Sequence, residues 1–370
     1  MVTITIMDVC PLVFEPIYRP KIWGGRNLSR LLDKRLPPEV SIGESWECAD
    51  LECAQSIVAR GPARGSKLGD LVREWGRSLL GRAQVMDDSF PLLIKFLDAA
   101  ENLSIQVHPD TEAAARLGIA VRPKDEAWHI LEARQNAAIY RGLRPGVALQ
   151  AFAAALEKDP PSIVDLLYRI PVRAGDTFYV PSGTVHAIGA GVVVAEIQTP
   201  SDVTFRLYDW GRLRPKDDAG LHLTDGLACI RSRIDFASFE KKSHVTSVFT
   251  TVTRLVTCPS FILERVRFVG DIEQPIPYAE PVIWIVLEGR GEILYGRNGV
   301  ETFAKGDVVL LPAALKEPRL RTKADCVWLE VTIPAPSDLA EYDRPSADVL
   351  RAPDGAPAAP IPLNVSIQRQ

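Results

Sequence analysis

The feature that most constrains the fold of this chain is a short pattern that occurs twice. The first copy, at positions 175–186, reads G-D-T-F-Y-V-P-S-G-T-V-H, and the second, at 306–316, reads G-D-V-V-L-L-P-A-A-L-K. Each copy begins with Gly-Asp, continues with four largely apolar residues and then reaches a proline. Such a segment is typical of a tight turn, a short strand and a second turn. Two copies in one chain predict two related β-barrels.

The remainder of the chain also favours short strands. It has 29 prolines in 370 residues, and short β-branched runs alternate with turn residues. Strands are expected at 92–97, 103–107, 177–180, 192–198, 261–268, 282–287, 292–295 and 308–311. The few expected helices are one capped by Ser66 and stopped by Gly81, one capped by Asp110 or Thr111, a pair at 147–158 and 162–168 broken by Pro160 and Pro161, and a short one near 223–230.

The first copy of the pattern ends at a histidine. Gly175, Pro181, Gly183 and His186 match G-x5-P-x-G-x2-H, the second sequence motif of cupin barrels. Ala190 stands where that motif usually has asparagine, so the match is partial at its end. We expect His186 to begin the returning strand with its imidazole facing the barrel interior.

The predicted fold is therefore mostly β, with two cupin (jelly-roll) barrels and a small helical insertion. Residues 1–240 are expected to form a metal-binding catalytic barrel, with the helical insertion around 147–168. Residues 241–335 are expected to form a second, degenerate barrel, whose copy of the pattern has no histidine. Residues 336–370 are rich in proline and alanine, which predicts an irregular tail.

Three residues upstream of His186 complete a candidate metal site. In the segment L-S-I-Q-V-H-P-D, Gln106 and His108 are two positions apart, so on a strand their side chains share a face. Glu126 follows in K-D-E-A-W. Two imidazoles, a carboxylate and an amide oxygen are typical of an open catalytic zinc site, although Mn, Co and Fe accept similar ligands. Taken singly, each of these residues is more often an ordinary strand-end, surface or core residue than a metal ligand.

Composition and charge exclude several classes of function. The net charge is −4 with no basic cluster, so neither nucleic acid nor an anionic membrane is an expected partner. No apolar run approaches the roughly 18 residues that a membrane span needs, and the N-terminus lacks the features of a signal peptide. The six cysteines are scattered and form no C-x-x-C pair, which favours reduced thiols and the cytoplasm. The sequence leaves the oligomeric state open.

Seven segments together carry a resemblance to a known family. They are Y-R-P-K-I-W-G-G (18–25), G-E-S-W-E (43–47), F-P-L-L-I-K-F-L-D-A (90–99), L-S-I-Q-V-H-P-D (103–110), K-D-E-A-W (124–128), G-T-V-H-A-I-G (183–189) and Q-T-P-S-D-V-T-F-R-L-Y-D-W (198–210). On these motifs the chain resembles the type I mannose-6-phosphate isomerases, particularly their shorter bacterial form. The last third of the chain resembles the family mainly in its expected architecture.

The resemblance implies a cofactor, a substrate and a reaction. It implies one zinc ion held by Gln106, His108, Glu126 and His186. It implies a sugar phosphate as the small-molecule partner and the interconversion of mannose 6-phosphate and fructose 6-phosphate. That reaction moves a proton between C1 and C2 through a cis-enediol, and it needs an electrophile near the two oxygens and a base beside the carbons.

Four further residues are candidates for the catalytic roles. Lys95 lies in an apolar run, where a charge is costly unless it is paired or used; the resemblance places it near the sugar. Lys124 precedes Glu126, and beside a metal we expect its pKa to be lowered so that it serves as base or relay. The resemblance directs Arg206 into the cleft, where a guanidinium suits an enediolate or a phosphate. Asp202 is expected to orient Arg206 or to assist ring opening.

Two features limit what the resemblance transfers. Longer members of the family have a histidine just before the lysine that matches Lys124, whereas this chain has Pro123. No glycine-rich phosphate loop is visible, so Arg19, Lys21 and Arg212 are the candidates for the phosphate. His129, His222 and His244 fall in no such pattern and are expected to be ordinary residues.

Three other functions are compatible with parts of this pattern. Another sugar isomerase or epimerase fits the same barrel, because cupins host many chemistries. A non-catalytic sugar-phosphate-binding regulator also fits, although the expected metal ligands are all present. A metal-dependent dioxygenase is disfavoured, because the Gln-His-Glu-His set differs from the usual iron site of two histidines and one carboxylate.

Overall fold

The structure is a computed structural model that describes residues 8–83, 89–120, 122–213 and 220–334. These residues form two compact units. The first unit contains the described residues of 14–57 and 89–242, and the second contains those of 8–13, 58–83 and 243–334. The second unit thus takes in two N-terminal segments, whereas the sequence predicted a single boundary after residue 240. The tail predicted at 336–370 lies outside the described residues.

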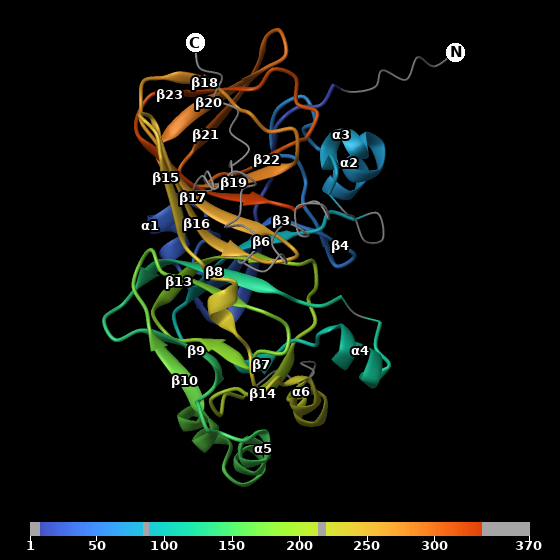
Figure 1. The fold of residues 1–370 in the computed structure, drawn as a ribbon, viewed down its shortest axis with the longest axis vertical. Coiled ribbons are helices and arrows are strands. Elements are labelled where there is room, and N and C mark those ends of the chain that lie inside the picture. The colour runs from blue at the N-terminus through green and yellow to red at the C-terminus, as the bar shows by residue number, and fades with distance from the viewer. Residues whose placement is uncertain (1–7, 84–88, 121, 214–219, 335–370) are drawn as a thin grey trace, which may run out of the picture. The chain divides into compact units, whose positions relative to one another are not determined.

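The first unit is built from two antiparallel sheets (Figure 1). One has the order β11-β8-β13-β6-β2-β3 and the other the order β10-β9-β12-β7-β14. Their strands are β2 (Ile17–Gly25), β3 (Ile42–Cys48), β6 (Leu93–Ala99), β7 (Ile105–Val107), β8 (Glu126–Ala133), β9 (Ala138–Leu143), β10 (Leu167–Pro171), β11 (Thr177–Val180), β12 (His186–Ile188), β13 (Val192–Gln198) and β14 (Phe205–Tyr208), with a small ribbon of β4 (Asp50–Leu51) and β5 (Ala54–Gln55) beside them. The mostly β fold predicted from the sequence is confirmed.

Short helices connect the strands of the first unit. They are α1 (Asn27–Leu32), α4 (Thr111–Leu117), α5 (Leu149–Lys158), α6 (Leu223–Cys229) and the 3-10 turns η1 (Pro160–Leu166) and η2 (Phe236–Ser238). Asp110 caps α4, as predicted, by accepting a hydrogen bond from the backbone N–H of Ala113 at 2.7 Å. The helix predicted at 162–168 is wrong: this segment is a 3-10 turn that begins at two prolines, and from Leu167 the chain pairs with β9 as strand β10.

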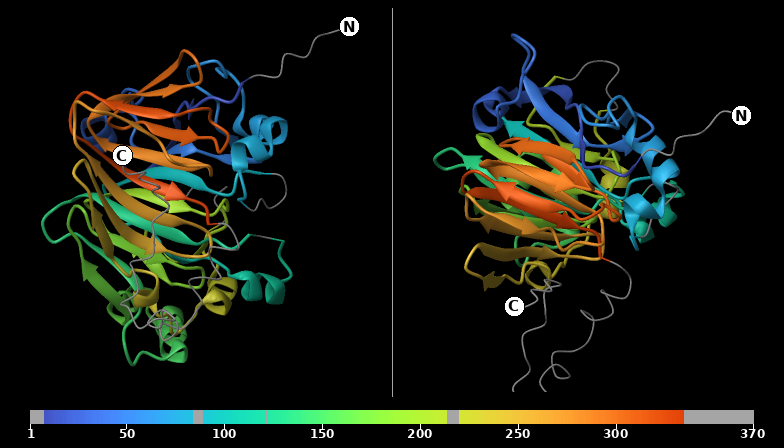
Figure 2. Two further views of the ribbon diagram at one scale, coloured as in Figure 1. Left: turned by 45° about the horizontal axis from the view of Figure 1, so that its top comes forward. Right: turned by 90° about the horizontal axis from the view of Figure 1, so that it is seen from above.

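The second unit also contains two antiparallel sheets. Figure 2 shows several of their strands, in orange and red, running side by side. The sheet orders are β1-β22-β19-β24-β17-β16-β15 and β18-β23-β20-β21. The strands are β1 (Leu12–Val13), β15 (Ser243–Thr246), β16 (Thr250–Thr257), β17 (Ile262–Phe268), β18 (Glu273–Pro275), β19 (Val282–Glu288), β20 (Arg290–Tyr295), β21 (Gly299–Ala304), β22 (Val308–Leu311), β23 (Arg319–Thr322) and β24 (Cys326–Thr332), and the helices are α2 (Leu68–Trp75) and α3 (Arg77–Leu80).

The N-terminal segments belong to the second unit for a physical reason. Strand β1 pairs with β22, with Leu12 opposite Leu310 and Val13 opposite Val309. The α2–α3 segment is tied to the same unit by hydrogen bonds from the backbone N–H groups of Ala313 and Ala314. These contacts join residues far apart in the sequence, which is why local patterns did not predict them.

Strand register confirms that the two units repeat one design. In the first unit β8 pairs with β11 and β13, so that Trp128 lies opposite both Phe178 and Glu196. In the second unit β19 pairs with β22 and β24, and Trp284 lies opposite Glu330 in the corresponding place. Each tryptophan donates its indole N–H to its glutamate, at 3.0 Å and 3.1 Å respectively. A cross-strand pair kept in the same register of two sheets is strong evidence for a common architecture.

The same register shows that the position corresponding to Glu126 is apolar in the second unit. Glu126 lies opposite Val180, and the position that corresponds to it in the second unit is Val282, opposite Leu311. Val282 is fully buried in an apolar core that includes Trp284 and Trp328. Among the described residues, the grouping of three or more metal-ligating side chains lies in the first unit alone. No helix within the described ranges is long and apolar enough to cross a membrane.

Candidate active site

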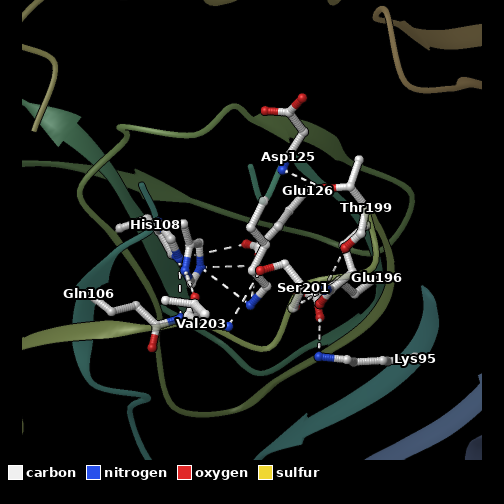
Figure 3. Close-up of polar contacts among 12 residues, drawn as sticks. Lys95, Gln106, His108, Asp125, Glu126, Glu196, Thr199, Ser201 and Val203 are labelled. Atoms are coloured by element: carbon white, nitrogen blue, oxygen red, sulfur yellow. Dashed lines mark hydrogen bonds and ion pairs between the residues drawn. The ribbon is translucent and has the colours of Figure 1, made fainter. Parts of the chain in front are cut away.

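Three of the predicted ligands meet in the interior of the first barrel. His108 Nε2 lies 3.1 Å from Glu126 Oε1, and His186 Nε2 lies 3.6 Å from Glu126 Oε2. All three side chains are about 1% exposed, and their ligand atoms lie within 4.8 Å of one another. Glu126 begins β8 in one sheet and His186 begins β12 in the other, so both sheets of the barrel contribute. Figure 3 shows His108 turned toward Glu126.

The hydrogen bonds of the two imidazoles favour a cation between them. His108 Nδ1 lies 2.8 Å from the carbonyl oxygen of Val203, and His186 Nδ1 lies 2.8 Å from that of Thr184. A carbonyl oxygen can only accept, so each Nδ1 bears the proton and each Nε2 presents a lone pair. Both lone pairs face the buried Glu126 carboxylate, and the Lys124 ammonium lies beside them, 3.4 Å from His108 Nε2. A hydrogen bond from Nδ1 to a backbone carbonyl is a usual second contact of metal-ligating histidines. These residues therefore fit a metal ion.

The protonation states of the group agree with metal binding. Burial, together with the Lys124 ammonium, lowers the pKa of His108 to about 3, and burial lowers the pKa of His186. Burial alone would raise the pKa of Glu126, but Lys124 and His108 lower it well below its usual value. The group therefore offers two neutral imidazoles and one carboxylate at neutral pH, which are the forms that bind a divalent cation.

Gln106 lies beside this group on the face predicted for it. It pairs with His186 across β7 and β12, and its Nε2 lies 3.2 Å from His186 Nε2, while Ser104 donates its hydroxyl to Oε1 at 3.1 Å. The amide nitrogen rather than the oxygen thus faces the histidine. A half-turn of the amide exchanges the two atoms, and Gln106 as a ligand remains a prediction.

Lys124 contacts two members of the group. Its Nζ lies 2.9 Å from Glu126 Oε1 and 3.4 Å from His108 Nε2. The lowered pKa expected for Lys124 beside a metal stays a prediction, because the groups that act on its pKa here are burial and three carboxylates. Burial lowers the pKa, but the carboxylates of Glu126, Glu196 and Asp202 raise it by more. Lys124 is therefore a buried cation.

Lys95 forms a second buried ion pair with a residue that the sequence analysis missed. Its Nζ lies 3.6 Å from Glu196 Oε2 (Figure 3), and both side chains are about 5% exposed or less. Burial and the nearby Glu126 raise the pKa of Glu196 to about 7. Glu196 is the lone carboxylate in the apolar run V-V-V-A-E-I-Q. This signal is the same one that identified Lys95, so Glu196 was recognisable from the sequence.

All of these groups except His108 line one cavity of about 470 Å³. Its lining includes Lys95, Gln106, Lys124, Glu126, His186, Asp202 and Arg206 from the predicted set. Of the three phosphate candidates, only Lys21 lines it. Arg19 instead stacks on the Trp46 ring at 4.8 Å, and Arg212 pairs with Asp209. The lining also includes Glu44, Thr204 and His222, which the sequence analysis did not select.

One wall of the cavity depends on two glycine-containing motifs. Between Pro20 and Gly25 the register of β2 against β3 is interrupted, so Lys21 and Trp23 project over the cavity. A Cβ at Gly43 would lie 2.6 Å from Lys21 Cβ and 2.8 Å from the Trp23 ring. The G-E-S-W-E motif therefore needs glycine at its first position to admit this bulge. Lys21 is then held by Glu44, with its Nζ 3.1 Å from Oε1.

Fold and site together define a cupin-type protein with a candidate metal centre at the base of a polar, charge-lined cavity. The catalytic-domain model of the type I phosphomannose isomerases matches residues 12–133. Mannose-6-phosphate isomerase ManA of Bacillus subtilis is 35% identical over 328 residues, which cover 87% of this chain and 99% of that protein. Mannose-6-phosphate isomerase of Streptococcus mutans is 35% identical over 325 residues, covering 83% and 93%.

A solved structure agrees with these relatives. The crystal structure of the mannose 6-phosphate isomerase from Bacillus subtilis superposes with a TM-score of 0.78 at 30% identity, covering 87% of this chain and 99% of that one. The chain belongs to the type I phosphomannose isomerase family.

Proposed function

We propose that this protein interconverts mannose 6-phosphate and fructose 6-phosphate. The observation that carries the proposal is the buried His108–Glu126–His186 group at the base of a cavity whose walls hold Lys95, Lys124 and Arg206. An aldose–ketose isomerase needs this combination, because charge develops on two neighbouring oxygens while a proton moves between their carbons. Family membership supports the choice of substrate.

The metal centre is proposed to hold one zinc ion. His108, Glu126 and His186 would bind it, with the amide oxygen of Gln106 as a fourth ligand. Nitrogen and oxygen donors of this kind suit zinc and leave room for substrate oxygens. When bound, the ion supplies positive charge beside O1 and O2 of the open-chain sugar, which lowers the cost of the enediolate.

The proton transfers are assigned to residues of the cavity. In the forward direction a proton leaves C2 of the open-chain aldose and returns to C1, while the hydroxyl proton moves from O2 to O1. Glu196 is a buried carboxylate able to take and return the carbon-bound proton. Lys124, a cation that contacts Glu126, is suited to donating to and accepting from the oxygens. Lys95 holds Glu196 in place.

Arg206 and Asp202 complete the proposed assignment. Both line the cavity from the segment around β14. The Arg206 guanidinium is suited to stabilising the enediolate through paired hydrogen bonds. Asp202 interacts electrostatically with Lys124 and is proposed to assist ring opening. Pro123 stands where longer relatives have a histidine, so in this chain these steps rely on other groups.

A coupled enzymatic assay tests the proposal directly. Purified protein is given mannose 6-phosphate, and fructose 6-phosphate is detected, with a panel of other aldose phosphates run in parallel. Turnover of mannose 6-phosphate well above the others supports the proposal. Preference for another sugar phosphate would establish a different isomerase or epimerase, and tight binding without turnover would establish a regulator. The cytoplasm remains the proposed compartment, supported by six cysteines that are all unpaired.

A further inference from the structure

Each ligand of the candidate metal group is oriented by a different loop segment. Residues 123–125 lead directly into Glu126. The turn at 181–184 and the segment at 199–203 each end at a carbonyl that holds Nδ1 of one of the two histidines. The geometry of the group therefore depends on how these three segments are held together.

Thr199 joins its own segment to the one that precedes the glutamate. Its hydroxyl donates to the carbonyl oxygen of Pro123 at 2.7 Å and accepts from the backbone N–H of Asp125 at 3.0 Å (Figure 3). The backbone N–H of Thr199 donates in turn to the carbonyl oxygen of Asp125 at 3.1 Å. Thr199 therefore fixes the backbone on both sides of Lys124.

Ser182 joins its own turn to the same aspartate. Both its backbone N–H and its hydroxyl donate to Asp125 Oδ1, each at 3.0 Å. The next residue, Gly183, donates its backbone N–H to the carbonyl oxygen of His108 at 2.8 Å. Figure 3 shows the Asp125 carboxylate pointing away from His108, so this carboxylate binds the turn and is not a ligand of the metal group. Asp125 is therefore held from two sides, by Thr199 and by Ser182.

The second unit has apolar side chains at the positions that correspond to these three residues. The positions are counted from the matched tryptophans, from the matched prolines of the repeated motif and from the matched glutamates of β13 and β24. In place of Asp125, Ser182 and Thr199 the second unit has Pro281, Ala313 and Ile333. None of these side chains has a polar atom, so none can form the network. The strand arrangement is common to both units, whereas the polar network accompanies the metal-ligating group.

We propose that Thr199 and Ser182 are positioning residues for the metal group, because they hold Asp125 and thereby keep Glu126 in place against the two histidines. Their hydrogen bonds act through the backbone, so their loss should weaken metal binding without removing a ligand. The inference rests on the proposed function, since it assumes the metal centre described there.

Two substitutions of Thr199 separate this role from a general contribution to stability. Thr199→Val keeps the shape of the side chain and removes the hydroxyl, whereas Thr199→Ser keeps the hydroxyl. Loss of a residue that orients metal ligands typically weakens metal binding about 10-fold or more. We therefore expect Thr199→Val to raise the zinc Kd about 10-fold and Thr199→Ser to bind zinc as the wild type does. Ser182→Ala should raise the Kd by less, because its backbone N–H still donates to Asp125.

Thr177→Val is the matched control in the same barrel. Thr177 is buried on β11, where it pairs with His129, and its hydroxyl lies 2.9 Å from His129 Nδ1. The same ladder pairs Glu126 with Val180 at its other end. Thr177→Val should therefore lower the melting temperature of the metal-free protein, as Thr199→Val does, and leave the zinc Kd unchanged.

Zinc titration of metal-free protein against a competing chelator, with thermal unfolding of the same samples, makes the measurement. A wild-type zinc Kd in Thr199→Val, or an equal weakening in Thr177→Val, would overturn the inference. Failure of the wild-type protein to bind zinc would overturn the proposed metal centre and the inference together. Zinc binding that depends on Thr199, in a wild-type protein that does not turn over mannose 6-phosphate, would overturn the proposed function and support the inference.

Discussion

At the scale of single residues, the site depends on which ring nitrogen of each histidine is hydrogen-bonded to the backbone. Backbone carbonyls hold Nδ1 of His108 and of His186, and so both Nε2 atoms face Glu126. The sequence predicted this convergence from strand alternation and a turn motif. The tautomers were not predictable, because the carbonyls of Val203 and Thr184 come within reach only in the folded barrel.

Replacing His186 with alanine should remove metal and activity together. The substitution takes away one of the two imidazole ligands, so we expect at least a 100-fold fall in turnover and a substoichiometric metal content after dialysis. His244→Ala is the matched control, since His244 is exposed on β15 in the second unit. Metal analysis and the coupled assay on both variants make the check, and full activity in His186→Ala would rule out this site.

The buried pair of Lys95 and Glu196 should show strong coupling. Removing Lys95 alone, as Lys95→Met, leaves Glu196 buried without its partner, and loss of one member of such a pair costs about 3–5 kcal/mol. The double variant with Glu196→Gln should recover much of this stability while remaining inactive. Denaturant unfolding of the single and double variants measures the coupling. Additive losses would mean that the two side chains do not interact energetically.

Of two cavity residues that were not selected from the sequence, only one has a sequence pattern that could have identified it. Glu196 carried a usable signal, a carboxylate within an apolar strand. His222 carried none, because its place in the cavity depends on pairing with the edge of β14, 16 residues away in the chain. Tertiary contacts of this kind are not encoded in a local pattern.

At the scale of elements, strands with a strong apolar pattern were predictable and irregular ones were not. The strands β11, β13 and β22 occupy the predicted ranges. The bulge in β2 and the strand β10 were missed. In the bulge, glycines and close packing override the alternation, and β10 forms because β9 offers it a partner.

The bulge of β2 should be sensitive to a single methyl group. Gly43→Ala would place a Cβ 2.6 Å from Lys21, so the bulge must shift, and overpacking of this kind costs about 1–3 kcal/mol. Since Lys21 and Trp23 line the cavity, we also expect the KM for mannose 6-phosphate to rise several-fold. Gly299→Ala is the control: its Cβ would lie 2.5 Å from the Tyr295 ring in the second unit.

Thermal unfolding and steady-state kinetics distinguish the two glycine variants. Both should lose stability, and only Gly43→Ala should change the KM. Equal kinetic parameters for the two variants would show that the bulge does not shape the binding site.

At the scale of the whole molecule, two units share one strand arrangement, and among the residues that the structure describes the candidate metal-ligating group lies in the first unit alone. Both keep the cross-strand Trp–Glu pair. In the first unit the glutamate faces Lys95, whereas in the second Glu330 lies opposite Glu264 and accepts a hydrogen bond from Tyr278 at 2.6 Å. The internal repeat was visible in the sequence. The assignment of two N-terminal segments to the second unit was not, because it rests on long-range pairing.

Glu330 should make the stability of the second unit depend on pH. Burial and the nearby Glu264 raise its pKa to about 7, from an ordinary value of 4.5, against the hydrogen bonds from Tyr278 and two tryptophans. The folded state therefore holds a proton that the unfolded chain releases at lower pH. Its stabilising contribution is full below about pH 4.5, declines as the pH rises and is lost above about pH 7. The total change is about 3 kcal/mol, since one pKa unit is worth about 1.4 kcal/mol.

Glu330→Gln should flatten this dependence. The free energy of unfolding of the variant, relative to wild type, should rise by about 3 kcal/mol between pH 4.5 and pH 8. Denaturant titrations across that range measure it, with Glu288→Gln, at an exposed position of β19, as the control. Parallel pH profiles for wild type and Glu330→Gln would show that Glu330 titrates normally.

We propose that the mannose-6-phosphate isomerase activity depends on a metal ion bound by the buried His108–Glu126–His186 group. The most direct measurement strips the protein with a chelator, titrates zinc back and follows conversion of mannose 6-phosphate to fructose 6-phosphate at each step. We predict that turnover disappears on stripping and returns in proportion to added zinc until one ion per chain is bound. Undiminished turnover by protein shown to be free of metal would rule out a metal-dependent reaction at this group.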